Sequence, residues 1–282
     1  MSRASKPPRR PSRTPKPPAA RGRSDGREAR RGERAAAGEG LQRPDGLEVI
    51  YGLHAAAAVL ANPGRAVREV LATRAAGSRL ADEAGVRFDA RIAAPADLDG
   101  LCGAGAVHQG VAVLAEPLAR LDLEAAAAPA EAGRPVLVLD QITDPRNIGA
   151  ILRSAAAFAA RCVVVHDRST PPLDGALAKA AAGAVETVPV VRAVNIARAV
   201  EELQAMGYRA VGLAGETEAA IGETLDGPVA IALGAEGPGL RRLVRERCDA
   251  LARIPMPGVM ESLNVSVAAA IALYEASRRR PS

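Results

Sequence analysis

Aromatic residues are nearly absent from this chain. Only 2% of its 282 residues are Phe, Tyr or Trp, and Trp is missing altogether. Proteins that bind single-stranded RNA commonly stack its bases on aromatic rings. The composition therefore disfavours a surface that binds RNA by stacking. The hydrophobic content is nevertheless 48%. The cores must therefore be built from Ala, Val, Leu and Ile.

Cysteine is scarce as well. The three cysteines, Cys102, Cys162 and Cys248, are odd in number, scattered, and never in a C-x-x-C pair. This disfavours a disulfide framework and a zinc site, and it fits a reducing compartment, for which we expect the cytoplasm. No uncharged apolar run reaches the ~18 residues of a membrane span, and no signal-peptide pattern begins the chain. We therefore expect no membrane association and no bound metal.

Positive charge is concentrated at the amino terminus. Residues 1–45 hold 13 Lys and Arg against 5 Asp and Glu, whereas the rest of the chain holds 24 against 27. The segment is rich in Pro, Arg, Gly and Ser, so we expect a disordered basic arm over 1–45. It is either a solvated tail or a non-specific attractor of RNA phosphates. Its acidic residues argue weakly against a transit peptide.

Beyond the arm, the patterns predict two α/β domains. Short strands and helices alternate over 46–116, and residues 117–134 have the composition of a linker. Residues 135–282 alternate apolar strands with amphipathic helices, which predicts a parallel sheet covered on both faces. In such sheets, ligands bind at the carboxyl ends of the strands.

Three polar loops follow apolar strands of the second domain. They are "DQITDPRNIGAILR" after the strand at 135–140, "GAEGPGL" at 234–240, and "IPMPGVMESLN" at 254–264. Asn264 is well placed to cap the apolar helix that follows it. Because the carboxyl ends of parallel strands share one edge, we expect the three loops to form one site.

Each loop alone carries limited information. Gly234, Gly237 and Gly239 allow a close approach of backbone to a ligand and permit positive φ, but a structural turn would use them too. The pattern is neither G-x-G-x-x-G nor a P-loop, so a nicotinamide oxidoreductase is a poor interpretation. Taken alone, Asn147 could be a helix cap and Arg153 a solvated surface residue. Both face the loop edge only if the start of their helix is tilted or irregular.

Together, "DPRNIGAILRSAAAF", "IALGAEGPGL" and "IPMPGVMESLNVSVAAAIALYE" resemble, in order, the three motifs of the SpoU/TrmH-type RNA ribose 2′-O-methyltransferases of the SPOUT superfamily. The segment 47–116, with "YGLHAAAAVL" and "HQGVAV", is similar to that group's L30e-like substrate-binding domain. The resemblance implies an enzyme that methylates a ribose 2′-OH of RNA, most specifically a guanosine of 23S rRNA in the large subunit. It also implies a carboxyl-terminal trefoil knot and a homodimer that packs through the last helix.

The resemblance further implies S-adenosylmethionine as cofactor and assigns residues to the site. The cofactor-binding positions it implies are Leu233, Gly234, Gly237, Ile254, Met256 and Leu263. The catalytic positions it implies are Asn147, Arg153, Glu236, Ser262 and Asn264. Arg153 would lie beside the target hydroxyl, as a general base or as a charge that stabilises the developing alkoxide. The second role needs no deprotonated guanidinium.

Two alternatives stay open at this point. A transfer RNA 2′-O-methyltransferase would share the three loops, and only the small amino-terminal domain argues against it. An RNA-binding protein with an inactive site is the other, although the five polar residues at 147, 153, 236, 262 and 264 are all present.

Overall fold

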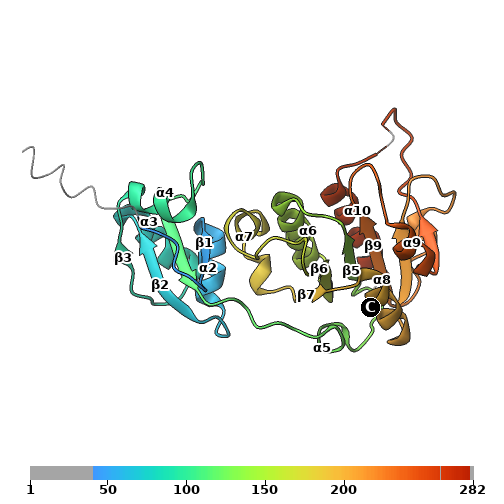
Figure 1. The fold of residues 1–282 in the computed structure, drawn as a ribbon, viewed down its shortest axis with the longest axis horizontal. Coiled ribbons are helices and arrows are strands. Elements are labelled where there is room, and N and C mark those ends of the chain that lie inside the picture. Colours follow the sequence, from blue (N-terminus) through green and yellow to red (C-terminus); the bar gives the residue numbers. More distant parts are fainter. Residues whose placement is uncertain (1–40, 261, 280–282) are drawn as a thin grey trace, which may run out of the picture. The chain divides into compact units, whose positions relative to one another are not determined.

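The computed structural model describes residues 41–260 and 262–279. The basic arm predicted over 1–45 therefore lies outside the described residues, apart from its last five. From Gly40 onward the chain forms one compact unit, and this unit contains two sheets (Figure 1). Among the described residues, no helix combines the length and the apolar character needed to cross a bilayer.

The first sheet is small and mixed, with the strand order β1-β4-β2-β3. Its strands are β1 (Glu48–Tyr51), β2 (Val67–Ala72), β3 (Arg91–Ile92) and β4 (Val111–Ala115). The accompanying helices are α2 (Leu53–Ala61), α3 (Arg74–Ala84) and α4 (Pro95–Cys102). The segment 86–92 ("VRFDARI") has the alternation typical of a strand, but only its two exposed residues at the sheet edge, Arg91 and Ile92, pair with β2. An edge strand with no buried face has little to hold it in register.

The second sheet has six strands, all parallel, in the order β10-β8-β9-β5-β6-β7. They are β5 (Val136–Asp140), β6 (Cys162–His166), β7 (Val190–Ala193), β8 (Arg209–Leu213), β9 (Val229–Gly234) and β10 (Ala250–Ala252). The central strands β5 and β9 are buried almost throughout, as expected for strands covered on both faces. The predicted α/β fold with a parallel sheet is confirmed.

Helices cover both faces of this sheet. One face packs against α6 (Pro145–Ala157), α7 (Gly175–Ala181) and α10 (Val265–Ser277). The other packs against α5 (Leu123–Ala127), α8 (Ile196–Ala205) and α9 (Arg242–Arg247). Two short 3₁₀ turns, η1 (Ala184–Glu186) and η2 (Ile221–Glu223), complete the elements. The segment 186–192 ("ETVPVVR") is typical of a strand, but β7 contains only its last three residues, and Glu186 belongs to η1.

The segment predicted as a linker is attached to the second sheet. It contains α5, which the sequence did not predict and whose Ala126 and Ala127 are buried. The Tyr208 hydroxyl donates to the Ala127 carbonyl at 2.6 Å, and burial raises the pKa of Tyr208 to about 12. Arg161 donates to the carbonyls of residues 127–129. The buried hydrogen bond of Tyr208 contributes about 1 kcal/mol.

Buried charges join the end of α2 to η1. Glu186 accepts from Asn62 Nδ2 at 2.8 Å and pairs with Arg65 Nε at 3.8 Å. Arg65 also pairs with Glu48. Burial raises the pKa of the Glu48 carboxyl, and the charge of Arg65 opposes that shift. Removing one partner from such a cluster costs several kcal/mol, so these residues hold α2 against η1.

Two expectations stay predictions. The division into domains at 46–116 and 135–282 is one of them, although each sheet lies within one of these ranges. The threading of the carboxyl-terminal loop into a trefoil knot is the other.

Candidate active site

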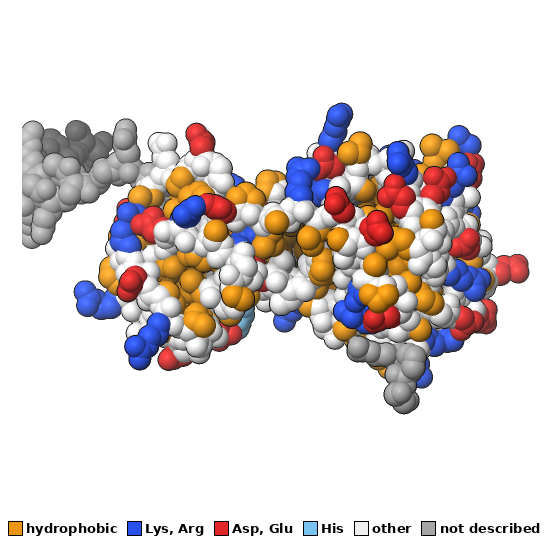
Figure 2. All heavy atoms as spheres, turned by 90° about the horizontal axis from the view of Figure 1, so that it is seen from below, with side chains coloured by type: hydrophobic (Ala, Val, Ile, Leu, Met, Phe, Trp, Pro, Cys, Tyr) orange, Lys and Arg blue, Asp and Glu red, His pale blue; other side chains and the backbone are white. Residues whose placement is uncertain are grey.

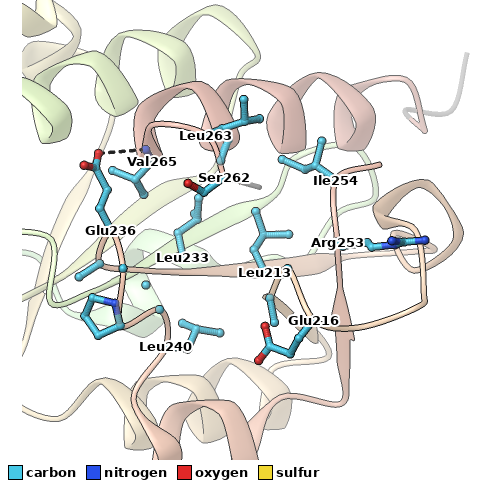
Figure 3. A pocket seen from close by; sticks show the side chains of 18 of the residues that line it. Leu213, Glu216, Leu233, Glu236, Leu240, Arg253, Ile254, Ser262, Leu263 and Val265 are labelled. Atoms are coloured by element: carbon cyan, nitrogen blue, oxygen red, sulfur yellow. Dashed lines mark hydrogen bonds between the residues drawn. The ribbon is translucent and has the colours of Figure 1, made fainter. Parts of the chain in front are cut away.

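The predicted meeting of three loops at one sheet edge follows from the strand pairing. Parallel β5 and β9 run in register until Asp140 lies opposite Gly234, and β8 and β10 run in the same direction. The loops after β8, β9 and β10 line a hollow of about 660 Å³. The segment after β5 does not line it, but Asn147 of that segment donates to Glu236 at the same edge. This volume lies within the range of cofactor and drug-sized ligand sites. In Figure 3, Leu213, Leu233 and Leu263 approach the same space from different segments.

All six residues proposed to bind cofactor line this hollow. They are Leu233, Gly234, Gly237, Ile254, Met256 and Leu263. The apolar members suit the flat face of a purine, and the glycines leave backbone N–H and C=O groups accessible to a ligand. The residue set therefore fits S-adenosylmethionine in size and chemistry.

The loop 234–240 is folded tightly back on itself. The Gly239 N–H donates to the Ala235 carbonyl at 2.9 Å. A Cβ built on Gly234 would lie 2.0 Å from the Gly239 carbonyl carbon and 2.2 Å from the Leu240 nitrogen. Gly237 and Gly239 have φ of 86° and 68°, a region that favours glycine. The glycines of this loop are thus required by its shape, and the shape provides one wall of the hollow.

Glu236 connects the three predicted loops. Its Oε1 accepts from Asn147 Nδ2 at 3.3 Å, from Asn264 Nδ2 at 2.8 Å and from the Val265 N–H at 3.3 Å. Figure 3 shows this carboxylate reaching from its loop to the start of α10. A carboxylate is favoured at a helix N-terminus, where backbone N–H groups have no partner within the helix. Glu236 thereby fixes the position of α10 relative to the glycine loop.

Asn264, at the end of the third loop, contacts Asn147 as well as Glu236. Its Nδ2 also donates to Asn147 Oδ1 at 3.0 Å, and its Oδ1 accepts from the Ser266 N–H at 2.9 Å. The predicted N-cap of α10 is therefore observed. Ser262 is exposed and lines the hollow. The structure thus brings Asn147, Glu236 and Asn264 into direct contact, with Ser262 beside them on the hollow wall.

Arg153 lies elsewhere within the single chain. It is exposed on α6, almost two turns beyond Asn147, and like Asn147 it does not line the hollow. It lines a second hollow of about 500 Å³ instead, with His54, Glu83 and Thr187. Arg153 and Asn147 are six residues apart, which places them on different sides of a helix with 3.6 residues per turn. This spacing accounts for their separation.

One wall of the hollow was not predicted from the sequence. The loop after β8, from Leu213 to Glu216, lines it together with Arg245 of α9. Glu216 pairs with Arg245, whose hydrogen bond lowers the pKa of the Glu216 carboxyl. The sequence "GLAGE" spans the end of β8 and carries a charged residue, Glu216, at the same edge. That is the signal that could have found this loop.

The chain belongs to the SpoU rRNA Methylase family, whose profile matches residues 134–274. A second profile, "RNA 2'-O ribose methyltransferase substrate binding", matches residues 49–121.

Two curated relatives and one solved structure illustrate the similarity. The Xylella fastidiosa (strain Temecula1) "23S rRNA (guanosine-2'-O-)-methyltransferase RlmB" is 43% identical over 82% of this chain and 96% of its own length. The Xanthomonas campestris pv. campestris protein of the same name is 42% identical over 82% and 96%. The SpoU methyltransferase AviRb from Streptomyces viridochromogenes, crystallised with the cofactor AdoMet, has a TM-score of 0.68 at 26% identity, over 83% of this chain and 90% of that one.

Proposed function

We propose that this chain transfers a methyl group from S-adenosylmethionine to a ribose 2′-OH of RNA, at a guanosine of 23S rRNA. The observation that carries the proposal is the hollow walled by the glycine loop and the 254–264 loop, with the Asn147–Glu236–Asn264 cluster at its side. Curated relatives named as 23S rRNA guanosine-2′-O-methyltransferases support the substrate. The two matched profiles support the division into a substrate-binding domain and a methyltransferase domain.

The protein's own groups must orient the ribose and stabilise its oxygen. Bound S-adenosylmethionine supplies a methyl group on an electrophilic sulfonium. Glu236 and the two asparagines hold the loops at fixed separation, and the hydroxyl of Ser262 is exposed to position the RNA. Transfer would form the O–CH3 bond, break the S–CH3 bond to leave S-adenosylhomocysteine, and pass the proton of the 2′-OH to water. Arg153 stabilises the negative charge that develops on the 2′-oxygen during this step. A guanidinium suits this role because it stays protonated.

We further propose a homodimer in which α10 contributes to the interface. Its buried side includes Ala269 and Leu273, yet Val267 and Tyr274 are 46% and 49% exposed on the same helix. A helix that is apolar all round normally has both sides covered. In such a dimer Arg153, which lies outside its own hollow, would serve the hollow of the second copy.

One experiment separates the candidate activities. Purified protein is incubated with labelled S-adenosylmethionine and, separately, with unmodified 23S rRNA and unmodified bulk transfer RNA. We expect label in the 23S rRNA alone, in a product that resists nuclease cleavage at one ribose. Label in transfer RNA would keep the chemistry and reject the substrate. Cofactor binding without transfer to either RNA, or to an assembling large subunit, would support an inactive RNA-binding protein.

We expect the basic arm to supply salt-dependent affinity for RNA. Charges of both signs are interspersed on the face of the described residues in Figure 2, and residues 46–282 carry more acidic than basic groups. Deleting residues 1–40 should weaken RNA binding roughly tenfold near 0.1 M salt and flatten the dependence of log K on log salt. The deletion stops before Arg43, because Arg43 pairs with the buried Asp174.

The control for this deletion keeps the arm and removes its charge. All Lys and Arg of residues 1–40 are replaced by Gln. RNA binding is then titrated at salt concentrations from about 50 to about 300 mM, a range over which counterion release changes the affinity strongly. Both variants should lose the same part of the salt slope. A slope equal to that of the intact protein would identify the arm as a solvated tail.

The reducing environment suggested by the free cysteines leads us to place the enzyme in the cytoplasm.

A further inference from the structure

Asp140 is a buried carboxylate that the chemistry above does not use. It ends β5, its side chain is 0% exposed, and it lies opposite Gly234 in the sheet. An unpaired charge in such a position would cost several kcal/mol. Its hydrogen-bond partners therefore indicate why a carboxylate stands there.

All of the partners found for Asp140 among the described residues belong to Arg241. The Arg241 N–H donates to Oδ2 at 2.8 Å. Its Nε donates to Oδ1 at 2.8 Å, and its Nη2 lies 2.7 Å from the same oxygen. This is a charge-assisted contact at three points, which restrains both the backbone and the side chain of Arg241.

Arg241 stands at the far end of the glycine loop. The loop runs from Gly234 to Leu240, and Arg241 comes directly after it as the residue that precedes α9. Asp140 therefore contacts both ends of the loop, through the β5–β9 register at Gly234 and through its carboxylate at Arg241. Between these ends stand Glu236 and several of the residues that line the hollow.

We propose that Asp140 is a positioning residue for the cofactor. Through Arg241 it sets the separation of the two ends of loop 234–240, and so holds that wall of the hollow in its binding conformation. The inference rests on the proposed cofactor site. It adds Asp140 and Arg241, which do not themselves need to touch the ligand.

The test is calorimetric titration of Asp140→Asn with S-adenosylmethionine and with S-adenosylhomocysteine. The variant keeps the size of the side chain but leaves the guanidinium without its charge partner. We expect Kd for both ligands to rise at least about tenfold, because small displacements of a positioning loop have large effects. At saturating cofactor, kcat should fall by less than Kd rises.

The matched control is Asp174→Asn. Asp174 is also a buried carboxylate, 7% exposed, that accepts a backbone N–H, from Val49, and pairs with an arginine, Arg43. It does not line the hollow. This control should lower the melting temperature without changing the Kd for cofactor. If Asp140→Asn loses only melting temperature, as the control does, Asp140 is purely structural and the inference fails.

A second variant keeps the test independent of folding. Arg241→Lys acts on a side chain that is 47% exposed and keeps the charge. It removes the contacts of Nε and Nη2 with Asp140, while the backbone N–H can still donate to Oδ2. It should raise the Kd roughly threefold to tenfold, and an unchanged Kd overturns the inference even if Asp140→Asn does not fold. Failure of the unaltered protein to bind either ligand would reject the proposed cofactor site instead, so the two failures are distinguishable.

Discussion

Replacing Arg153 by alanine is expected to lower methyl transfer to RNA by at least roughly 10²-fold, the effect of removing one group that stabilises a developing oxyanion. The Kd for S-adenosylmethionine should stay nearly unchanged, because Arg153 is exposed on α6 and does not line the cofactor hollow. Single-turnover transfer to 23S rRNA and calorimetric titration of the cofactor measure the two quantities. Arg153→Lys, which keeps a charge without the planar fork, should recover part of the rate.

The control for this variant is Arg198→Ala. Arg198 is an exposed arginine on α8, which covers the opposite face of the sheet, and its loss should leave both quantities unaltered. A weakened affinity of Arg153→Ala for the cofactor would contradict the role assigned to it. A further measurement addresses the second copy. Mixing the Arg153→Ala chain with a chain that cannot bind cofactor should restore activity if Arg153 serves the partner's hollow, and should not if it acts within its own chain.

The second large effect is expected at Gly234. Gly234→Ala places a methyl group 2.0 Å from the Gly239 carbonyl carbon and 2.2 Å from the Gly239 oxygen. Backbone atoms cannot yield as a flexible side chain would, so the loop must open. We expect affinity for S-adenosylmethionine to fall by at least roughly 10²-fold, with a loss of stability on the order of 1–3 kcal/mol from overpacking.

Gly258→Ala is the matched control for Gly234→Ala. Gly258 lies in the neighbouring loop, and its added Cβ would meet nothing within 4 Å. Calorimetric titration and thermal unfolding of the two variants should therefore differ clearly. Equal affinities for the cofactor would show that the glycine loop tolerates a different shape, and the account of this wall would be wrong.

The sequence predicted the alternating elements and the shared edge of the three loops well. Alternation of apolar strands with helices requires a parallel sheet, and parallel strands present all of their carboxyl ends on one side. The roles of Glu236, Asn147 and Asn264 were implied by the resemblance to the family motifs. The shared edge explains how these three residues, which are far apart in the sequence, come into contact.

The order of the strands could not be derived in this way. Several arrangements of parallel strands satisfy the same pattern, and the structure places β8 between β9 and β10. The loop from Leu213 to Glu216 therefore lies between two predicted loops and becomes a wall of the hollow. Asp140 was missed for a related reason. Its importance depends on Arg241, a residue 101 positions away that only the β5–β9 pairing brings close.

The attached linker has a consequence for how RNA reaches the site. Leu118 packs on the core beneath the second sheet, Arg120 pairs with Asp167 at 3.3 Å, and α5 is clamped through Ala127. The ends of a flexible 18-residue tether would be separated by roughly 20–25 Å on average. RNA bound at one end would then have a lower effective concentration at the other. A tether fastened along its length leaves only a few residues of slack after β4. For an RNA element held by the proposed substrate-binding domain, this short slack would give a high effective concentration at the site, and avidity would be gained without any additional contact.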